Sequence, residues 1–249
     1  MDRSDFLRAL AGAARGLETA MDARSRQWFV NMVATGHDAN PPDGHGSKEL
    51  TANRIFEFAC YFYLVGHLCR QSDRWALVRG DDQHGYRLAY SPGAKTNFAF
   101  FRYEFDDEVV DLCCGVRIPV PGEPDEAPDI SLQQVAVWDT AQRASGILVG
   151  LWEVKFHGPG KSLTKSDFNQ MVSRCDVLQP PRCAASDWLE RVCPEPFRGH
   201  ALVTNVPPAS NTTFNLAQRL RLRFSLVFSF DGTAGPALDP SRADHLAAP

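Results

Sequence analysis

The hydrophobic positions divide the chain into a helical first part and a strand-rich middle. Leucine and alanine recur at helical spacing within residues 4–34, which predicts helices there. Residues 36–47 are dense in Gly, Pro, Asn and Asp and predict a loop. Residues 50–69 are apolar almost all round, so we expect a buried helix. Residues 1–47 are therefore expected to form an N-terminal helical appendage and loop before the main domain.

From residue 75 the pattern changes to short runs rich in β-branched and aromatic residues, separated by Pro, Gly and Asp. Two helical patterns then alternate with two further apolar runs. The expected strands are 75–80, 86–91, 98–105, 109–118, 129–138, 147–156, 200–206 and 224–230, and the expected helices are 164–178 and 213–222. This order predicts an α/β fold, a mixed sheet with helices on both faces.

The main domain is expected over residues 48–230, with the strands of 75–104 as an insertion. Residues 231–249 are rich in Pro, Ala and Asp, which predicts a flexible tail. Ser166 or Asp167 is able to cap the start of the helix at 164–178.

The composition is that of an ordinary globular protein. The chain has 249 residues, of which 44% are hydrophobic and 22% charged, which excludes a disordered, collagen-like or coiled-coil chain. No apolar run approaches the roughly 20 residues of a membrane span. The N-terminus contains Asp2 and Asp5 and does not resemble a signal peptide. With seven cysteines, an odd number, we expect reduced thiols and a cytoplasmic location.

Charge is unevenly distributed. The net charge is −4, but residues 151–230 hold 10 Lys and Arg against 6 Asp and Glu, a net charge of +4. The overall acidity argues against general coating of nucleic acid, whereas the basic part leaves room for one surface that faces phosphate. Lys161, Lys165 and Arg174 are the candidates for phosphate contacts, and a solvated helix face is the alternative.

Asp129, Glu153 and Lys155 are the residues that point to chemistry. Asp129 begins one expected strand, and the other two lie near the end of the next. Side chains two positions apart on a strand share a face, so Glu153 and Lys155 project together. If the two strands form a hairpin, Asp129 comes close to Glu153. Two carboxylates suit Mg²⁺ or Mn²⁺, which binds substrate phosphate and polarises a water, and the lysine can hold the phosphate or that water.

Glu57 stands between Phe56 and Phe58 inside the apolar helix. Burial of an unpaired carboxylate is costly, so we expect a partner, a raised pKa or a metal ion. A solvent-facing position or a bond to Arg54 is the alternative. His157 would share the face of Lys155 and could contact phosphate, or it is a structural residue at the sheet edge.

Pro128, Asp129, Glu153 and Lys155 resemble the signature of the PD-(D/E)xK nuclease superfamily, which has a restriction-endonuclease-like fold. The resemblance covers residues 48–230, and the last helix and strand are similar to the Mrr- and RecB-like branches. It implies that Asp129 and Glu153 bind the metal and that Lys155 supports catalysis. It further implies a metal-binding role for Glu57 on the first helix and a supporting role for Gln170 on the later helix.

The function implied by this resemblance is that of a metal-dependent nuclease, with DNA as the expected substrate. The implied setting is prokaryotic restriction, defence or repair, and a homodimer or a protein partner on the N-terminal helices is compatible with it. The alternative is a non-catalytic nucleic-acid-binding or assembly protein on the same fold.

Two other sets of candidate ligands are present. Asp111 is a rival carboxylate for the metal, while Cys175, Cys183, Cys193 and His200 have spacings too irregular for a typical zinc site.

Overall fold

The computed structural model describes a β-sheet with helices packed against it. The described residues are 52–81, 92–106, 108–158, 160–178, 191–194, 197–206 and 223–226. The helices are α3 (Ala52–Gln71), the 3-10 helix η2 (Lys95–Asn97) and α4 (Lys165–Leu178). The strands are β1 (Arg74–Val78), β2 (Phe100–Phe105), β3 (Glu108–Cys114), β4 (Ile130–Val135), β5 (Ile147–Lys155), β6 (Ala201–Thr204) and β7 (Arg223–Leu226). The elements predicted over 1–47, 86–91, 213–222 and 231–249 lie outside the described residues.

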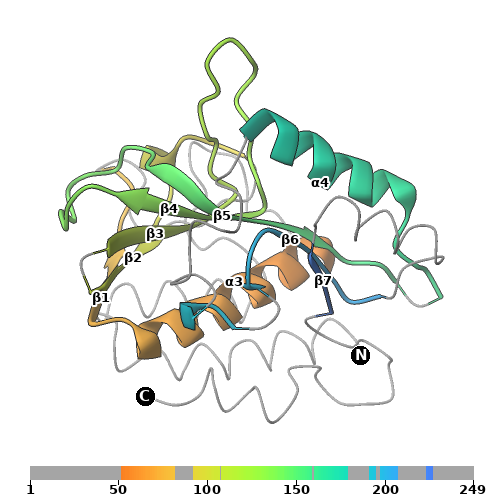
Figure 1. The fold of residues 1–249 in the computed structure, drawn as a ribbon, viewed down its shortest axis with the longest axis horizontal. Helices are drawn as coiled ribbons and strands as arrows, with labels where there is room; N and C mark the ends of the chain where they lie inside the picture. Colours follow the sequence, from red (N-terminus) through yellow and green to blue (C-terminus); the bar gives the residue numbers. More distant parts are fainter. Residues whose placement is uncertain are drawn as a thin grey trace, which may run out of the picture.

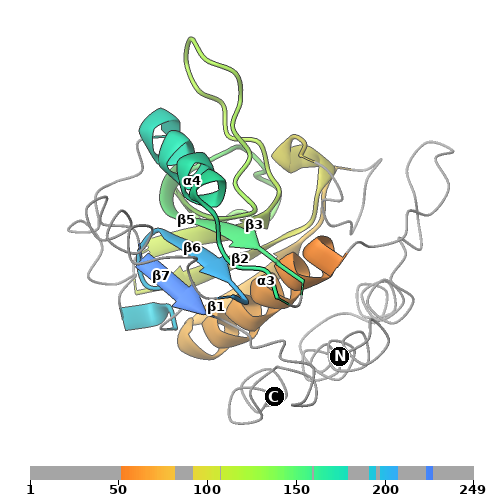
Figure 2. The same cartoon turned by 90° about the vertical axis from the view of Figure 1, so that its right-hand side faces the viewer.

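In the described part of the chain, seven strands form one sheet in the order β1-β2-β3-β4-β5-β6-β7. Strands β1 to β5 form an antiparallel meander, and β6 and β7 then run parallel to β5. Helix α4 lies in the connection between β5 and β6, as a parallel crossover requires. Figures 1 and 2 show α3 on one face of the sheet and α4 on the other. The predicted α/β class, a mixed sheet between helices, is confirmed.

Helix α3 is fixed to its face of the sheet by two tyrosine hydroxyls. The hydroxyl of Tyr61 on α3 donates to the carbonyl of Leu112 on β3 at 3.1 Å. In the opposite direction, the hydroxyl of Tyr103 on β2 donates to the carbonyl of Val65 on α3 at 3.3 Å. Each bond satisfies the polar end of a buried ring. Although α3 is mostly buried, none of the helices that the structure describes is long and apolar enough to cross a membrane.

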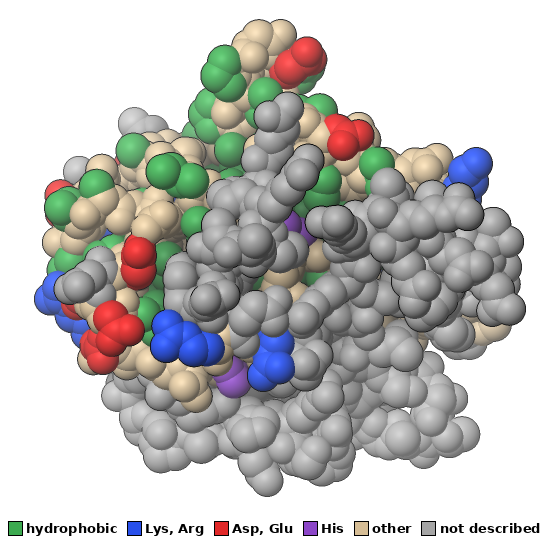
Figure 3. Space-filling view, in the orientation of Figure 1, with side chains coloured by type: hydrophobic (Ala, Val, Ile, Leu, Met, Phe, Trp, Pro, Cys, Tyr) green, Lys and Arg blue, Asp and Glu red, His purple; other side chains and the backbone are tan. Residues whose placement is uncertain are grey.

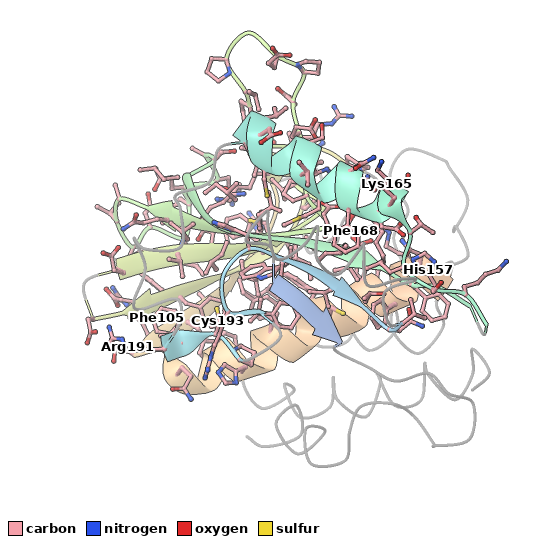
Figure 4. The ribbon with its side chains drawn as sticks, turned by 45° about the vertical axis from the view of Figure 1, so that its right-hand side comes forward. Phe105, His157, Lys165, Phe168, Arg191 and Cys193 are labelled. Carbon is pink, nitrogen blue, oxygen red and sulfur yellow. The ribbon has the colours of Figure 1, made fainter. Side chains whose placement is uncertain are left out.

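Helix α4 covers the other face with a narrow apolar stripe. Phe168 and Met171 are fully buried and belong to one cluster with Leu148 and Leu151 of β5 and Leu202 of β6. Figure 4 shows Phe168 on the side of α4 that faces the sheet. Residues three or four positions further along the helix therefore face the sheet as well.

The start of α4 is fixed by a reciprocal cap. The backbone N–H and the hydroxyl of Thr164 donate to Oδ2 of Asp167 at 2.7 and 2.8 Å, and the N–H of Asp167 returns to Oγ1 of Thr164 at 3.4 Å. This is the capping box of a helix N-terminus. The prediction that Ser166 or Asp167 is the capping residue is wrong: Thr164 occupies the cap position, and Asp167 is its partner in the first turn of α4.

A buried ion cluster lies on β2, β3 and β4. Nζ of Lys95 is 2.7 Å from Oδ2 of Asp111, and Nε of Arg102 is 2.6 Å from its Oδ1. Lys95 also donates to Oε1 of Gln133 at 3.2 Å and to the carbonyl of Ala144 at 3.0 Å. Asp111 is thus engaged by two cations. These contacts give it a structural role, and the sequence-based alternative that it is an additional metal ligand stays a prediction.

The same cluster explains why β4 is shorter than predicted. The strand ends at Val135 instead of residue 138. Beyond it, the carbonyls of Asp139 and Gln142 accept hydrogen bonds from the guanidinium of Arg102. The chain therefore leaves the sheet early because its carbonyls accept the remaining hydrogen bonds of the buried Arg102 guanidinium.

We predict a large difference between the buried and the exposed ion pairs of this sheet. Asp111→Asn leaves the buried cations Lys95 and Arg102 without their carboxylate, which should lower the free energy of unfolding by about 3–5 kcal/mol. Glu104→Gln on the partly exposed pair with Arg74 is the matched control and should cost less than about 1 kcal/mol. Chemical denaturation measures both. Equal losses would contradict a structural role for the buried cluster.

Candidate functional site

The register of β4 and β5 places two carboxylates side by side. Ile130 pairs with Trp152 across the antiparallel strands, and one further step sets Asp129 directly opposite Glu153. Oδ2 of Asp129 accepts the backbone N–H of Val154 at 2.8 Å, which ties its side chain to the end of β5. The predicted hairpin is confirmed. Like charges directly opposite on a sheet repel, so this pair requires cations nearby.

Lys155 provides one of those cations. Its Nζ lies 3.3 Å from Oε2 of Glu153 and 3.6 Å from Oδ2 of Asp129. Glu153 and Lys155 therefore share a face, as their spacing predicted. Burial acts to lower the pKa of Lys155, but the carboxylates of Asp129 and Glu153 outweigh it, and the net effect raises the pKa. The lysine is thus a protonated cation at neutral pH and not a general base.

Glu57 joins the site from α3. Its side chain is 1% exposed, and its carboxylate forms an ion pair with Arg54. The thiol of Cys114, at the end of β3, lies 3.5 Å from its Oε1. Burial, together with the charge of Asp129, raises the pKa of Glu57 to about 8. The expected features of a buried helical acid, a partner and a raised pKa, are both present, and the bond to Arg54 considered as an alternative is present as well.

Glu153 is engaged from α4. It is fully buried, and its Oε1 forms an ion pair with Arg174, whose Nε lies 3.4 Å from Oε2 of Glu126. Burial and the charge of Asp129 raise the pKa of the Glu153 carboxyl. Burial alone would lower the pKa of Arg174, but Glu153 raises it above its ordinary value, so the guanidinium stays charged. Both oxygens of Glu153 are held by cations.

The donor set suits a hard divalent cation. Glu57 on α3, Asp129 just before β4 and Glu153 on β5 supply carboxylate oxygens, and Mg²⁺ prefers such oxygens. Burial is the largest cause of the raised pKa of Glu57 and Glu153, and the charge of Asp129 raises both further; a bound cation would relieve this second effect. Among the described residues, however, no three His, Cys, Asp or Glu side chains stand in the arrangement of a metal site. The oxygens of Glu57 and Glu153 are directed instead at arginine and lysine partners.

The two predicted supporting residues do not join these contacts. His157 is half-buried, and its Nε2 lies 3.3 Å from Oδ2 of Asp167 without hydrogen-bond alignment. Its backbone N–H and carbonyl both bond to the side chain of Asn205 at 2.8 Å. Gln170 is exposed on α4. None of the contacts described for Glu153 involves His157 or Gln170.

Lys161 and Lys165, the other residues expected to contact phosphate, are exposed. Lys161 lies in the loop between β5 and α4, and Lys165 is the first residue of α4. Figure 4 shows Lys165 and His157 at the same end of the molecule. Arg174 differs from both lysines because it is tied to Glu153 and Glu126. Arg174 can therefore make its predicted phosphate contact only after its side chain rearranges.

The cysteine and histidine residues have packing roles where they are described. Nδ1 of His200 accepts the backbone N–H of Leu151 at 3.2 Å. Cys193 is buried, and Cys175 packs at the edge of the α4 cluster. Cys183 lies outside the described residues.

Sequence reasoning missed that Arg174 and Glu126 are part of the carboxylate site. The signal for Arg174 was present, because it follows Met171 by three positions and so lies on the sheet-facing side of α4. Glu126 gave no such signal, since it lies in a loop rich in proline and acid. Its position is set by a bridge in which its N–H and carbonyl pair with Ile118.

Comparisons of this chain with protein-family models, with curated proteins and with solved structures found no match.

We predict that stability without divalent cations falls as the pH rises from 5 to 8. In this range the folded protein retains a proton on Glu57, whose pKa is about 8, while the unfolded chain has released it at its ordinary pKa of 4.5. The folded state binds more protons, so the free energy of unfolding decreases with pH, by on the order of 1 kcal/mol or more. Denaturation at pH 5, 6.5 and 8 with a chelator measures this slope.

Glu57→Gln should reduce the slope because it removes one of the two buried carboxyls with a raised pKa, while Glu153 remains. Glu104→Gln, which changes a more exposed carboxylate, should leave the slope as it is. A slope that is the same in wild type and Glu57→Gln would show that Glu57 is ionised in the folded protein.

Proposed function

We propose that this protein is a metal-dependent nuclease that hydrolyses phosphodiester bonds, with DNA as its substrate. The observation that carries the proposal is the convergence of Asp129, Glu153 and Lys155 at the ends of two paired strands. Glu57 adds a third carboxylate from a buried helix. This places hard oxygen donors beside a protonated lysine, the combination that phosphoryl chemistry requires.

The topology supports the same conclusion. Helix α3, the antiparallel strands β3, β4 and β5, helix α4 and the parallel strand β6 follow one another along the chain. The resemblance to the PD-(D/E)xK nuclease superfamily implies this order of elements, with the acidic residues and the lysine on the second and third strands. Strands β1 and β2 extend the meander beyond β3 and correspond to the inserted strands. We therefore propose a restriction-endonuclease-like fold.

In the proposed mechanism, Asp129, Glu153 and Glu57 would hold Mg²⁺ or Mn²⁺, which would polarise a water molecule and neutralise phosphate charge. The hydrogen bond from Val154 orients Asp129 before any ligand binds. The Nζ–H of Lys155 donates a hydrogen bond to a phosphate oxygen or to the attacking water. The raised pKa of Lys155 keeps it charged for that purpose.

Lys161 and Lys165 are proposed to contact the DNA backbone. Both are exposed and flank the start of α4, which follows directly after β5. Phosphate contacts of this kind position the substrate without reading its sequence. Two sites are needed to cut both strands at once, which makes a homodimer or a partner protein compatible with the proposal. Restriction, defence or repair in a prokaryote is the proposed setting.

The second candidate is a non-catalytic nucleic-acid-binding or assembly protein on this fold. It is favoured by the ion pairs on both oxygens of Glu153, which complete a charge network without any metal. It predicts DNA binding that is independent of divalent cations.

The direct test is cleavage of supercoiled plasmid, linear duplex and single-stranded DNA with Mg²⁺ or Mn²⁺. Lys155→Ala removes the charge that stabilises the developing anion, so we expect the rate of cleavage to fall by at least about 100-fold. Lys161→Ala is the control: it should weaken DNA binding and reduce its salt dependence by about one phosphate contact, with little change in the rate at saturating DNA.

Equal cleavage by wild type and Lys155→Ala would contradict the role of Lys155. Binding of DNA with no cleavage under any metal condition, and with no effect of Asp129→Asn, would favour the second candidate.

A further inference from the structure

Arg174, on α4, is bound to one of the two carboxylate oxygens of Glu153. The guanidinium forms an ion pair with Oε1 of Glu153, while Lys155 holds Oε2 at 3.3 Å. The Glu153 side chain is fully buried, whereas 16% of the Arg174 side chain is exposed. Arg174 is therefore the solvent-accessible member of this pair, and it lies on one of the carboxylates proposed to bind the metal.

A divalent cation and a guanidinium compete for the same carboxylate oxygen because they repel each other at contact distance. Lys155 has both of its partners inside the carboxylate pair, since its Nζ is also 3.6 Å from Oδ2 of Asp129. Arg174 instead has its second partner outside that pair. Its Nε lies 3.4 Å from Oε2 of Glu126, in the loop between β3 and β4.

The backbone of Glu126, the second partner, is fixed by two hydrogen bonds to Ile118. The N–H of Ile118 donates to its carbonyl at 2.7 Å, and its own N–H donates to the carbonyl of Ile118 at 3.2 Å. Figure 1 shows this loop rising beside the end of α4 on which Arg174 lies, and Figure 3 shows acidic side chains on it. A guanidinium that leaves Glu153 thus remains close to the site.

We propose that Arg174 is a displaceable counter-ion: it holds Glu153 in the metal-free protein, leaves when a divalent cation binds, and then contacts the phosphate of the substrate from its anchor on Glu126. The inference rests on the proposed nuclease function. Arginine suits this role because its planar fork can bind Glu126 and a phosphate oxygen at the same time. Metal loading and phosphate binding are coupled by the movement of this one side chain.

The test is calorimetric titration of the full chain with Mn²⁺, beside cleavage of plasmid DNA at saturating Mn²⁺. Arg174→Gln removes the competitor, so we expect Mn²⁺ to bind about tenfold or more tightly than to wild type. The same variant should cleave at least about tenfold more slowly, because it has lost a phosphate contact. Lys161→Gln removes one exposed positive charge and should change Mn²⁺ affinity by less than about twofold.

Tighter Mn²⁺ binding together with slower cleavage by Arg174→Gln identifies a displaceable counter-ion. If Arg174 only positions Glu153 for the metal, Arg174→Gln binds Mn²⁺ more weakly or equally, and the inference is overturned while the nuclease proposal stands. If wild type and Arg174→Gln bind no Mn²⁺ and cut no DNA, both proposals fail. Arg174→Lys keeps the positive charge but not the planar fork of the guanidinium, and this variant should bind Mn²⁺ several-fold more tightly than wild type. If Arg174→Gln does not fold, Arg174→Lys tests the inference in its place.

Discussion

The antiparallel register between β4 and β5 determines where the charges of the candidate site lie. It sets Asp129 opposite Glu153, and the hydrogen bond from Val154 to Asp129 fixes that alignment from the side chain as well. A shift by one residue would turn Glu153 and Lys155 to the opposite face of the sheet, away from α4. Trp152 opposes such a shift, because it is fully buried and its Nε1–H donates to the carbonyl of Gly199 at 2.9 Å, which fixes the face that its ring occupies. The core of the sheet therefore maintains a pair of carboxylates that would repel each other in isolation.

The protein contains two buried ion clusters, and they differ in how well their charges are matched. In the first, Asp111 is bonded by Lys95 and Arg102, and backbone carbonyls complete the shells of both cations. Such a network contributes to structure and needs nothing further. In the second, burial and then the charge of Asp129 raise the pKa of Glu57 and Glu153 in spite of the cations around them. An excess of buried acid is typical of a site that binds a ligand, which is why the second cluster, and not the first, carries the proposed function.

The sequence predicted the order of the described elements and the central part of the site, because both depend on local patterns. Alternation and apolar runs located the strands, and the i, i+2 relation placed Glu153 beside Lys155. Contacts between distant segments could not be predicted in the same way. The sequence does not show that Lys95 pairs with Asp111, nor that Glu126 reaches Arg174, since these contacts depend on how loops fold over the sheet. Arg174 was expected to contact phosphate because it is a basic residue on an element that follows the site, although its spacing from Met171 places it on the sheet-facing side of α4.

The central claim is that Glu57, Asp129 and Glu153 form one site for a divalent cation. Titration of the full chain with Mn²⁺ at pH 7, in two buffers of different ionisation enthalpy, measures both binding and the protons released. With the pKa of Glu57 raised to about 8, the account predicts that binding releases protons. It further predicts that Glu57→Gln reduces this release and that Asp129→Asn abolishes binding. Absence of Mn²⁺ binding, or binding that Asp129→Asn leaves unchanged, would contradict the account.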